Sequence, residues 1–304
     1  MNNFRIRALG PGMALLAASQ LVAQQTFAGP VHSGYVEAGM EYRSNPVVDE
    51  LDVTANQSDT AALFQAGIST DWRATGRWSL YAGYDLDTRR HTTLDQFDLT
   101  LHLAQLGTRY DFSFATLGVE QLVARASLAD EPFLSQQQTT LYAEWLLGTR
   151  GLIRTGLTGG RHRYPAMSER NAAIRGVRTD LYWAATDKSM VLAGFDFDRV
   201  DSEAEEHRYT ASTLELRYQY GFNAFGRLHD AGIGWRYQRR DYREALPTAD
   251  SIVENRRLLQ AKLDLGLTDR IDLNVVAERG DVSSARPGVD YSDERLSLSL
   301  KASF

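Results

Sequence analysis

The sequence predicts an all-β protein, a transmembrane antiparallel up-and-down β-barrel of about 14 strands that follows a cleaved signal peptide. Three observations carry this prediction. The chain opens with a charged and then apolar leader, its body alternates apolar and polar residues with a period of two, and its closing stretch "RLSLSLKASF" keeps that alternation to the final residue. A terminal strand in a soluble protein usually frays, so an alternation that reaches Phe304 indicates a structural terminus.

The leader has the order of a secretory signal peptide. Two arginines are followed by the apolar stretch "ALLAASQLVA" and by small residues at Thr26 and Ala28, which suit cleavage near Ala28. We expect residues 1–28 to be the signal peptide and residues 29–304 to be one barrel domain, because no linker-like composition divides them. A cut near Ala23 and a buried N-terminal helix are the alternatives.

Composition excludes several classes of protein. The 304-residue chain has no cysteine, so it is neither a disulfide-stapled extracellular module nor lipid-anchored at its mature N-terminus. Its net charge of -6 gives no basic footprint for nucleic acid. The mean hydropathy is -0.36, and after the leader no apolar run reaches the roughly 18 to 20 residues of a membrane-spanning helix.

Alternation defines the strands. In "STLELRYQYGF", Leu214, Leu216 and Tyr218 share one face, while Glu215 and Arg217 share the other, and "AGIGWRYQR" and "RLLQAKLDLGL" follow the same pattern. About fourteen such segments occur, an even number that suits a closed barrel with both termini on one side. They begin near Val31, Thr60, Trp78, Phe97, Ala115, Gln138, Leu152, Ala173, Met190, Tyr209, Ala231, Arg257, Ile271 and Tyr291.

Two segments fit the pattern poorly. In residues 97–112 the apolar set runs from Phe97 to Leu103 and then switches phase at Leu106. A β-bulge near Ala104 would produce this switch, and an error in the assigned register is the alternative. Residues 115–128 are mixed on both faces, so the strand there is the weakest prediction of the set.

The connections fall into two kinds. Short ones lie at residues 74–77, 111–114, 148–151, 185–189 and 268–270, with a longer one at residues 223–230. Between them come mostly longer polar connections, such as residues 45–59, 201–207, 244–255 and 280–290. The five tryptophans, at positions 72, 78, 145, 183 and 235, lie toward the short-turn end. Short turns at one end, long loops at the other and an aromatic girdle are typical of outer-membrane barrels, whereas a secreted β-sandwich is the alternative.

If the apolar faces meet lipid, the polar faces line a lumen charged with both signs. These residues form either a pore lining or a structural ladder of arginine–carboxylate pairs, since an unpaired buried charge is costly. With about fourteen strands, the lumen could be open, narrow or plugged by loops. The predicted lumen-lining residues are Asp85, Asp87, Arg154, His162, Arg178, Asp180, Asp196, Asp198, Glu215, Arg217, Arg236, Arg240, Lys262 and Asp264.

No motif indicates an enzyme, a metal site or a cofactor. The chain has no G-x-S-x-G sequence, and a nucleophilic site would need Ser, His and an acid to converge. His162, in "GGRHRY", is the one histidine with a position that merits attention, because it faces the lumen between two arginines in sequence. The carboxylate pairs of "DLD" and "DFD" supply two candidate ligands each, too few to argue for Ca²⁺.

The closing "LSLSLKASF" resembles the terminal signal strand of Gram-negative outer-membrane proteins, which the barrel-assembly machinery recognises. Residues 31–304 also resemble the barrel of the surface lipoprotein assembly modifier family, through "GYVEAGMEYRSNP", "YAGYDLDTRRH" and "ENRRLLQAKLDLGLTDRIDLNVV". That resemblance implies a barrel of about 14 strands. Family members carry a helical-repeat domain before the barrel, whereas we expect this chain to enter its first strand directly after the signal peptide.

We therefore expect a non-enzymatic, porin-like channel for small hydrophilic solutes in the outer membrane. The alternatives are an accessory barrel for export or assembly of surface proteins, and a closed structural barrel that acts through its extracellular loops. Expected partners are outer-membrane lipids, the barrel-assembly machinery and possible periplasmic or surface proteins. The predicted terminal assembly signal is Leu296, Leu298, Leu300 and Phe304, on a strand that pairs with the first strand near residues 34–43.

Overall fold

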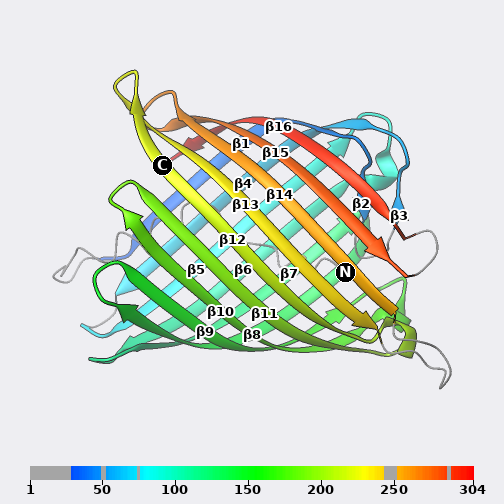
Figure 1. Cartoon of the computed structure of the whole chain (residues 1–304), viewed down its shortest axis with the longest axis horizontal. Coiled ribbons are helices and arrows are strands. Elements are labelled where there is room, and N and C mark those ends of the chain that lie inside the picture. Colours follow the sequence, from blue (N-terminus) through cyan, green and yellow to red (C-terminus); the bar gives the residue numbers. More distant parts are fainter. Residues whose placement is uncertain (1–28, 49–52, 74–75, 243–251, 286–288) are drawn as a thin grey trace.

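The computed structural model describes residues 29–48, 53–73, 76–242, 252–285 and 289–304, so the expected signal peptide lies outside the described residues. Fourteen antiparallel strands close into one barrel (Figure 1). Each barrel strand pairs with the next along the chain, and the first pairs with the last. The all-β antiparallel barrel and its strand number are confirmed.

The strand positions follow the alternation of the sequence closely. The barrel strands are β1 Val31–Arg43, β4 Asp59–Arg73, β5 Trp78–His91, β6 Leu99–Asp111, β7 Thr116–Leu128, β8 Glu131–Leu147, β9 Gly151–Arg163, β10 Ala172–Thr186, β11 Ser189–Ser202, β12 Tyr209–Ala224, β13 Arg227–Tyr242, β14 Ile252–Gly266, β15 Ile271–Ser284 and β16 Tyr291–Ser303. A small hairpin, β2 Val47–Val48 and β3 Val53–Thr54, and the 3₁₀ turns η1 Asp95–Phe97, η2 Ser168–Arg170 and η3 Glu205–His207 lie in connections.

Every barrel strand exposes at least one large apolar side chain on its outer face. Such a continuous exposed apolar surface would make a soluble protein aggregate, whereas a lipid bilayer covers it. One example from each strand, in chain order, is Met40, Ile68, Leu80, Leu106, Leu117, Leu141, Leu157, Val177, Phe195, Leu214, Ile233, Leu259, Ile271 and Leu298. The outer surface is therefore the lipid-facing surface of a membrane barrel.

The seam between β1 and β16 is paired along its length, as the terminal alternation predicts. The register runs from Tyr35 opposite Ser303 to Arg43 opposite Arg295. At the very end, Gly34 and Phe304 exchange both backbone hydrogen bonds, each 2.9 Å long. Because hydrocarbon offers no hydrogen-bond partner, the chain needs this last pair to leave no open edge.

The tryptophans form an incomplete girdle. Trp72, Trp78, Trp145 and Trp183 are exposed on the outer face close to short turns. Trp235 is also exposed, but it pairs with Leu259 in the middle of β14. Four of the five tryptophans therefore occupy the expected interfacial position, and the placement of Trp235 at the short-turn end is wrong.

The predicted bulge near Ala104 is absent from β6. Its register with β5 and with β7 is continuous, so Leu101 and Leu103 point inward and are buried, while Leu106 points outward and is exposed. The strand keeps one phase throughout, and the apolar residues of its first half point inward because they form an apolar part of the inner wall. The assumption that apolar residues must face lipid is wrong here.

The long connection predicted at residues 223–230 is also wrong. β12 continues to Ala224 and β13 begins at Arg227, so only Phe225 and Gly226 form the turn. Both have positive φ, 53° and 73°, as a type I′ hairpin requires. The sequence does not indicate this turn, because a bulky residue such as Phe225 rarely adopts positive φ.

A second tight turn joins β7 to β8 at the end where most connections are long. Ala129 and Asp130 have φ of 50° and 63°, and β8 begins at Glu131 rather than near Gln138. A register shift between Ala126 and Ser127 accompanies the turn. β8 is therefore longer than the alternation suggests.

Glycine at position 39 is required for the seam. A Cβ built there would lie 2.2 Å from the carbonyl oxygen of Leu298, whereas a Cβ at Gly159 of β9 meets nothing within 4 Å. We expect Gly39→Ala to weaken closure and to reduce the heat-modifiable, folded band on gels after refolding. Gly159→Ala, the matched control, should fold like the wild type, and equal behaviour of the two variants would contradict the role of this close approach.

Candidate functional site

The inner face of the barrel is polar because successive side chains of a strand point to opposite faces, and the apolar ones point outward to lipid. On β12, Leu214 and Leu216 are exposed, whereas Thr213 and Glu215 are buried. All the predicted lumen-lining residues occupy inner-face positions, two on each of seven strands. They are Asp85 and Asp87 on β5, Arg154 and His162 on β9, Arg178 and Asp180 on β10, Asp196 and Asp198 on β11, Glu215 and Arg217 on β12, Arg236 and Arg240 on β13, and Lys262 and Asp264 on β14.

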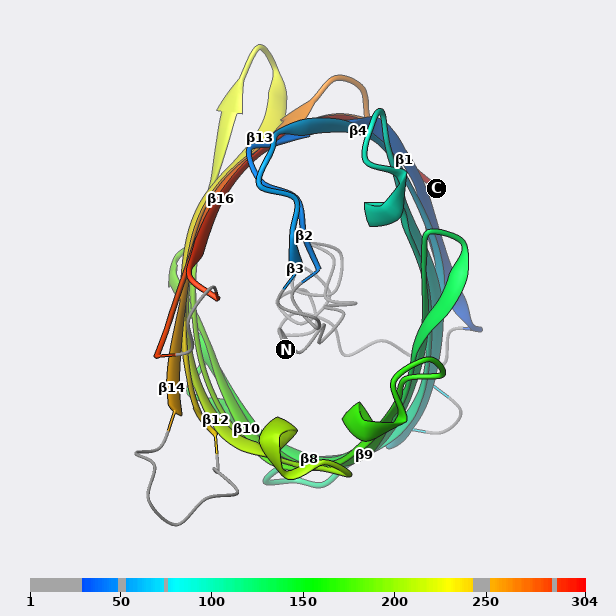
Figure 2. The same cartoon turned by 90° about the vertical axis from the view of Figure 1, so that its right-hand side faces the viewer.

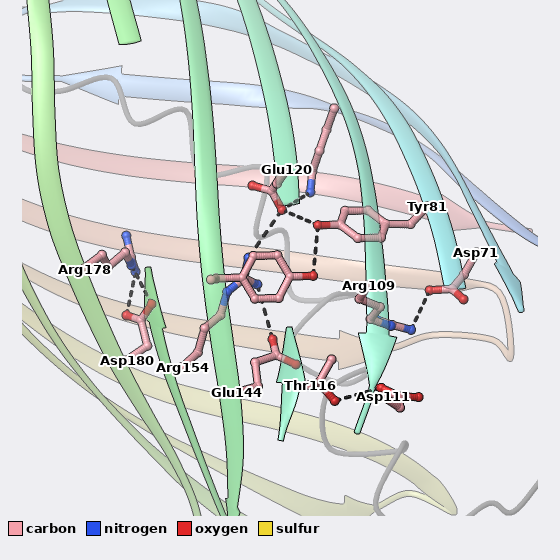
Figure 3. Close-up of polar contacts among 12 residues, drawn as sticks. Asp71, Tyr81, Arg109, Asp111, Thr116, Glu120, Glu144, Arg154, Arg178 and Asp180 are labelled. Carbon is pink, nitrogen blue, oxygen red and sulfur yellow. Dashed lines mark hydrogen bonds and ion pairs between the residues drawn. The ribbon is translucent and has the colours of Figure 1, made fainter. Parts of the chain in front are cut away.

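Arg154 lies at the centre of a cluster that we call the Arg154 network (Figure 3). Its guanidinium lies 3.5 Å from Glu120 Oε2 and 3.6 Å from Glu144 Oε1. It also lies over the ring of Tyr142, with Cζ 3.7 Å from the ring centre. The Tyr81 hydroxyl donates to Glu120 over 2.8 Å and lies 3.3 Å from the Tyr142 hydroxyl. One cation therefore compensates two carboxylates and ties together side chains from β5, β7, β8 and β9.

Further ion pairs flank this network on the inner wall (Figure 3). Arg109 Nη2 donates to Asp71 over 3.0 Å. Arg178 donates to both oxygens of Asp180, over 2.5 and 2.8 Å, and lies 3.7 Å from Asp196. The planar guanidinium matches the two oxygens of one carboxylate, which gives the bidentate pair its geometry.

The pairs continue around the lumen on β12 and β14. Arg217 Nε lies 2.7 Å from Glu215, and Lys262 Nζ lies 2.8 Å from Asp264. In each pair the partners are two residues apart on one strand, so both side chains lie on the same inner face. These contacts balance the opposite charges locally, as a structural ladder would.

A more deeply buried triad lies near the end of the barrel that carries the longer loops. Glu254 accepts hydrogen bonds from Arg240, over 3.2 Å, and from Arg256. Arg240 and Glu254 are 0% and 1% exposed, and the Arg240 guanidinium lies 5.2 Å from the ring centre of Tyr209. Removing either partner of so buried a pair would leave an uncompensated charge.

The seam carries its own charged row. Arg295 Nε lies 3.3 Å from Glu41 and 3.2 Å from Glu278. Lys301 lies over the Tyr35 ring, with Nζ 4.3 Å from its centre. These contacts join β15, β16 and β1 across the closure, on the face opposite to the lipid-facing leucines.

The β2–β3 hairpin folds from the rim into the ring of strands (Figure 2). At its base, Ala55 N donates to Pro46 O over 2.9 Å and Asn56 N donates to Asn45 Oδ1 over 2.8 Å. Asn45 N in turn donates to Asp293 of β16 over 3.0 Å. The first loop is thus fastened to the last strand and occupies part of the lumen.

An apolar cluster fills the inner wall at this same end. It joins Val48 of the hairpin to loop residues and to buried residues of β8 and β10–β13. Its buried members are Val48, Leu94, Phe97, Phe133, Leu134, Tyr164, Ala172, Ile174, Val200, Tyr209, Ala211 and Tyr242. A cavity of about 320 Å³ remains beside it, lined by residues from the hairpin and from the barrel wall.

His162 is buried at the loop end of β9, and in the described part of the chain neither ring nitrogen has a hydrogen-bond partner. A catalytic histidine is held by such a partner and faces a nucleophile. Within the described ranges no group of three or more His, Cys, Asp or Glu side chains suits a metal ion. Among those residues there is also no helix long and apolar enough to cross a membrane.

Sequence reasoning missed several inner-face residues. Tyr81 and Tyr142 are not among the charged residues predicted for the lumen because they are aromatic, although the register pairs Tyr142 with Gly118 and Gly156 on the neighbouring strands. Glu120 lies in the segment with mixed faces. Arg89 and Arg256 continue the alternation of Asp85 and Glu254, so extending the strand phase would have found them.

Residues 40–261 match the protein family described as the surface lipoprotein assembly modifier. Three solved outer-membrane proteins have the same fold. The outer-membrane channel DcaP of Acinetobacter baumannii matches with a TM-score of 0.59 and 11% identity, covering 93% of this chain and 100% of DcaP. OmpT, expressed in the outer membrane of Vibrio cholerae, matches with a TM-score of 0.55 and 8% identity, covering 92% and 99%.

The third solved structure with this fold is an anion-selective porin from Comamonas acidovorans. It matches with a TM-score of 0.52 and 8% identity, covering 91% of this chain and 99% of the porin. No curated protein sequence matches this chain significantly. At these identities the solved structures establish the architecture of the chain, and its chemistry must be argued from its own residues.

We expect Arg154→Gln to destabilise the barrel by about 1 to 3 kcal/mol, because Glu120 and Glu144 lose their shared cation while remaining half-buried. Urea unfolding of the refolded protein in detergent, followed by tryptophan fluorescence, measures this loss. The matched control is Arg199→Gln, which removes an exposed ion pair with Asp201 and should cost less than about 1 kcal/mol. Equal losses in the two variants would contradict the central role of the Arg154 network.

Proposed function

The chain belongs to the surface lipoprotein assembly modifier family, and from that premise and the geometry of its lumen we propose that this outer-membrane β-barrel is a passive channel for small hydrophilic solutes. The single observation that supports the proposal most is the charged inner wall of a closed barrel, which encloses a cavity of about 320 Å³. Charged walls offer a hydrophilic solute replacement for its hydration shell.

The pairing of the inner charges also suits passage. Because Arg154, Arg178 and Arg217 each have carboxylate partners on the wall, a solute meets fixed dipoles rather than one strong binding charge. Conduction requires sites that a solute can enter and also leave. A ladder of balanced pairs meets both requirements, and the predicted lumen-lining residues supply it.

The proposal is of a non-enzymatic protein. His162 is the strongest candidate for a catalytic base, and its burial without a hydrogen-bonded partner among the described residues argues against that role. A general base must reach the proton that it abstracts. Lipid turnover that disappears in His162→Ala would contradict this part of the proposal.

A second candidate function is an accessory barrel for export or assembly of surface lipoproteins, and the family match over residues 40–261 favours it. In that role the lumen or its rim would meet a periplasmic or surface protein. Co-purification of one defined periplasmic partner with the wild type, combined with electrically silent barrels, would support the second candidate over the first.

For biogenesis we propose that the barrel-assembly machinery recognises the terminal strand. Leu296, Leu298, Leu300 and Phe304 are all exposed on the lipid face of β16 or just beyond it. A strand with an apolar face that ends in an aromatic residue offers a partner protein both backbone groups for pairing and side chains for recognition on one face. The same residues then face lipid once the seam has closed.

Planar-bilayer recordings test the channel directly. Refolded protein without residues 1–28 should produce discrete conductance steps in pure phospholipid. Replacing residues 46–55 by two glycines should raise the conductance severalfold, because it removes the hairpin that occupies the lumen and keeps Asn45 and Asn56 at its base.

One outcome would contradict the channel proposal, and another would contradict only the role given to the hairpin. Silence from both proteins, with folding verified by heat-modifiable migration, would remove it and leave the accessory and closed-barrel alternatives. Identical conductance from the wild type and the shortened variant would show that the hairpin does not limit passage.

The assembly signal has a separate test. Phe304→Ala keeps both backbone hydrogen bonds to Gly34 and removes only the ring, so refolding in detergent should be nearly normal while the amount assembled in the outer membrane falls severalfold. Phe225→Ala, at an exposed hairpin turn, is the matched control and should assemble like the wild type. Normal assembly of Phe304→Ala in cells would contradict recognition of the terminal ring.

A further inference from the structure

The cavity beside the β2–β3 hairpin has two chemically different walls. One wall is apolar and is formed by inward-facing residues of β6, β7 and β8, including Leu101, Ala124 and Leu134. Leu101, Leu103 and Ala124 form a buried cluster of their own on this part of the wall. The part of this wall that β6 contributes is the stretch whose apolar residues depart from the expected alternation.

The other wall carries arginine. Five inward-facing arginines line the cavity, namely Arg43, Arg89, Arg236, Arg256 and Arg295. The inward-facing carboxylates that line it are Glu278 and Asp293. The carboxylates that pair with Arg89, Arg256 and Arg295, namely Asp87, Glu254 and Glu41, lie outside the lining, so arginine side chains outnumber carboxylates at the cavity surface.

The order of the strands places Arg236 on β13 and Arg256 on β14 across the lumen from the apolar wall, while Arg89 on β5 lies beside that wall, next to Leu99 of β6. Around the closed ring, β7 and β14 are seven steps apart in both directions. Ala124 and Ala126 of β7 therefore face the side that carries Arg236, Arg256 and Glu278. The hairpin residues Pro46 and Val48 border the cavity between these walls, as the position of the hairpin in Figure 2 indicates.

This arrangement selects a ligand with two unlike ends. A guanidinium pairs with a carboxylate through two parallel hydrogen bonds, and the arginines that line the cavity offer such groups to a ligand. An apolar body gains free energy by leaving water for the leucine and alanine wall. A small inorganic anion could satisfy the arginines alone, whereas an apolar cation would meet repulsion from them.

We propose that this cavity binds small amphipathic organic anions, in which one carboxylate is joined to a compact apolar group. The carboxylate lies against the arginine wall and the apolar group lies against β6–β8. The inference deepens the proposed channel function by naming a solute class, and it rests on that function only for the claim that such anions pass through the barrel.

Binding is tested with benzoate as the probe and with acetate and benzyltrimethylammonium as comparisons. Isothermal titration of the refolded, signal-free barrel in detergent should give at least about tenfold tighter binding for benzoate than for acetate, because only benzoate covers the apolar wall. Benzyltrimethylammonium should not bind measurably. Empty detergent micelles correct for partitioning of the aromatic probes.

Matched variants separate the two walls. Arg236→Gln should weaken benzoate and acetate together, whereas Arg239→Gln, on the outer face of the same strand, should weaken neither. Leu101→Thr should reduce the preference for benzoate over acetate, whereas Leu106→Thr, on the outer face of the same strand, should preserve it. Heat-modifiable migration verifies that each variant is folded.

The outcomes also separate this inference from the proposed function. A barrel that conducts ions but binds benzoate no more tightly than acetate overturns the amphipathic site and leaves the channel intact. A barrel that binds benzoate selectively but never conducts supports the site and overturns the channel. Selective binding that persists unchanged in both Arg236→Gln and Leu101→Thr places the ligand elsewhere and overturns the inference.

Discussion

The whole structure depends on satisfying backbone hydrogen bonds in a solvent that offers none. In hydrocarbon an unpaired strand edge is prohibitively costly, so a membrane sheet must close on itself. Here closure joins β1 to β16 and extends to Gly34 and Phe304, which exchange both backbone bonds. Once the sheet has closed, alternation directs every second side chain inward, and the chemistry of the lumen follows from that geometry.

The enclosed charges are held by partners rather than by water alone. The Arg154 network shares one guanidinium between two carboxylates and an aromatic ring, and the Glu254 triad repeats the principle with two cations on one acid. Such sharing lowers the cost of burying charge on a narrow wall. It also fixes the position of each group, so that the wall presents a defined pattern of charge to whatever enters.

Much of this fold could be predicted from alternation, because a barrel in lipid imposes the same two-residue period on every strand. The method fails where the lumen stops being polar. Leu101 and Leu103 have the pattern of lipid-facing residues, yet they point inward and form part of an apolar inner wall. No local pattern in the sequence indicates that this part of the wall is apolar. The Phe225–Gly226 turn was missed because phenylalanine rarely adopts positive φ. The ion pairs of the Arg154 network depend on the registers of β5 and of β7–β9 together, which no single segment contains.

The fastening of the first loop to the last strand sets an order of events. Asn45, at the base of the β2–β3 hairpin, is held by Asp293, which is separated from it by nearly the whole chain. During synthesis and insertion that carboxylate arrives only with β16. The hairpin therefore lacks this anchor until the barrel is complete, and the constriction is among the last features to mature. The strand that closes the sheet is thus also the strand that fixes the first loop in the lumen.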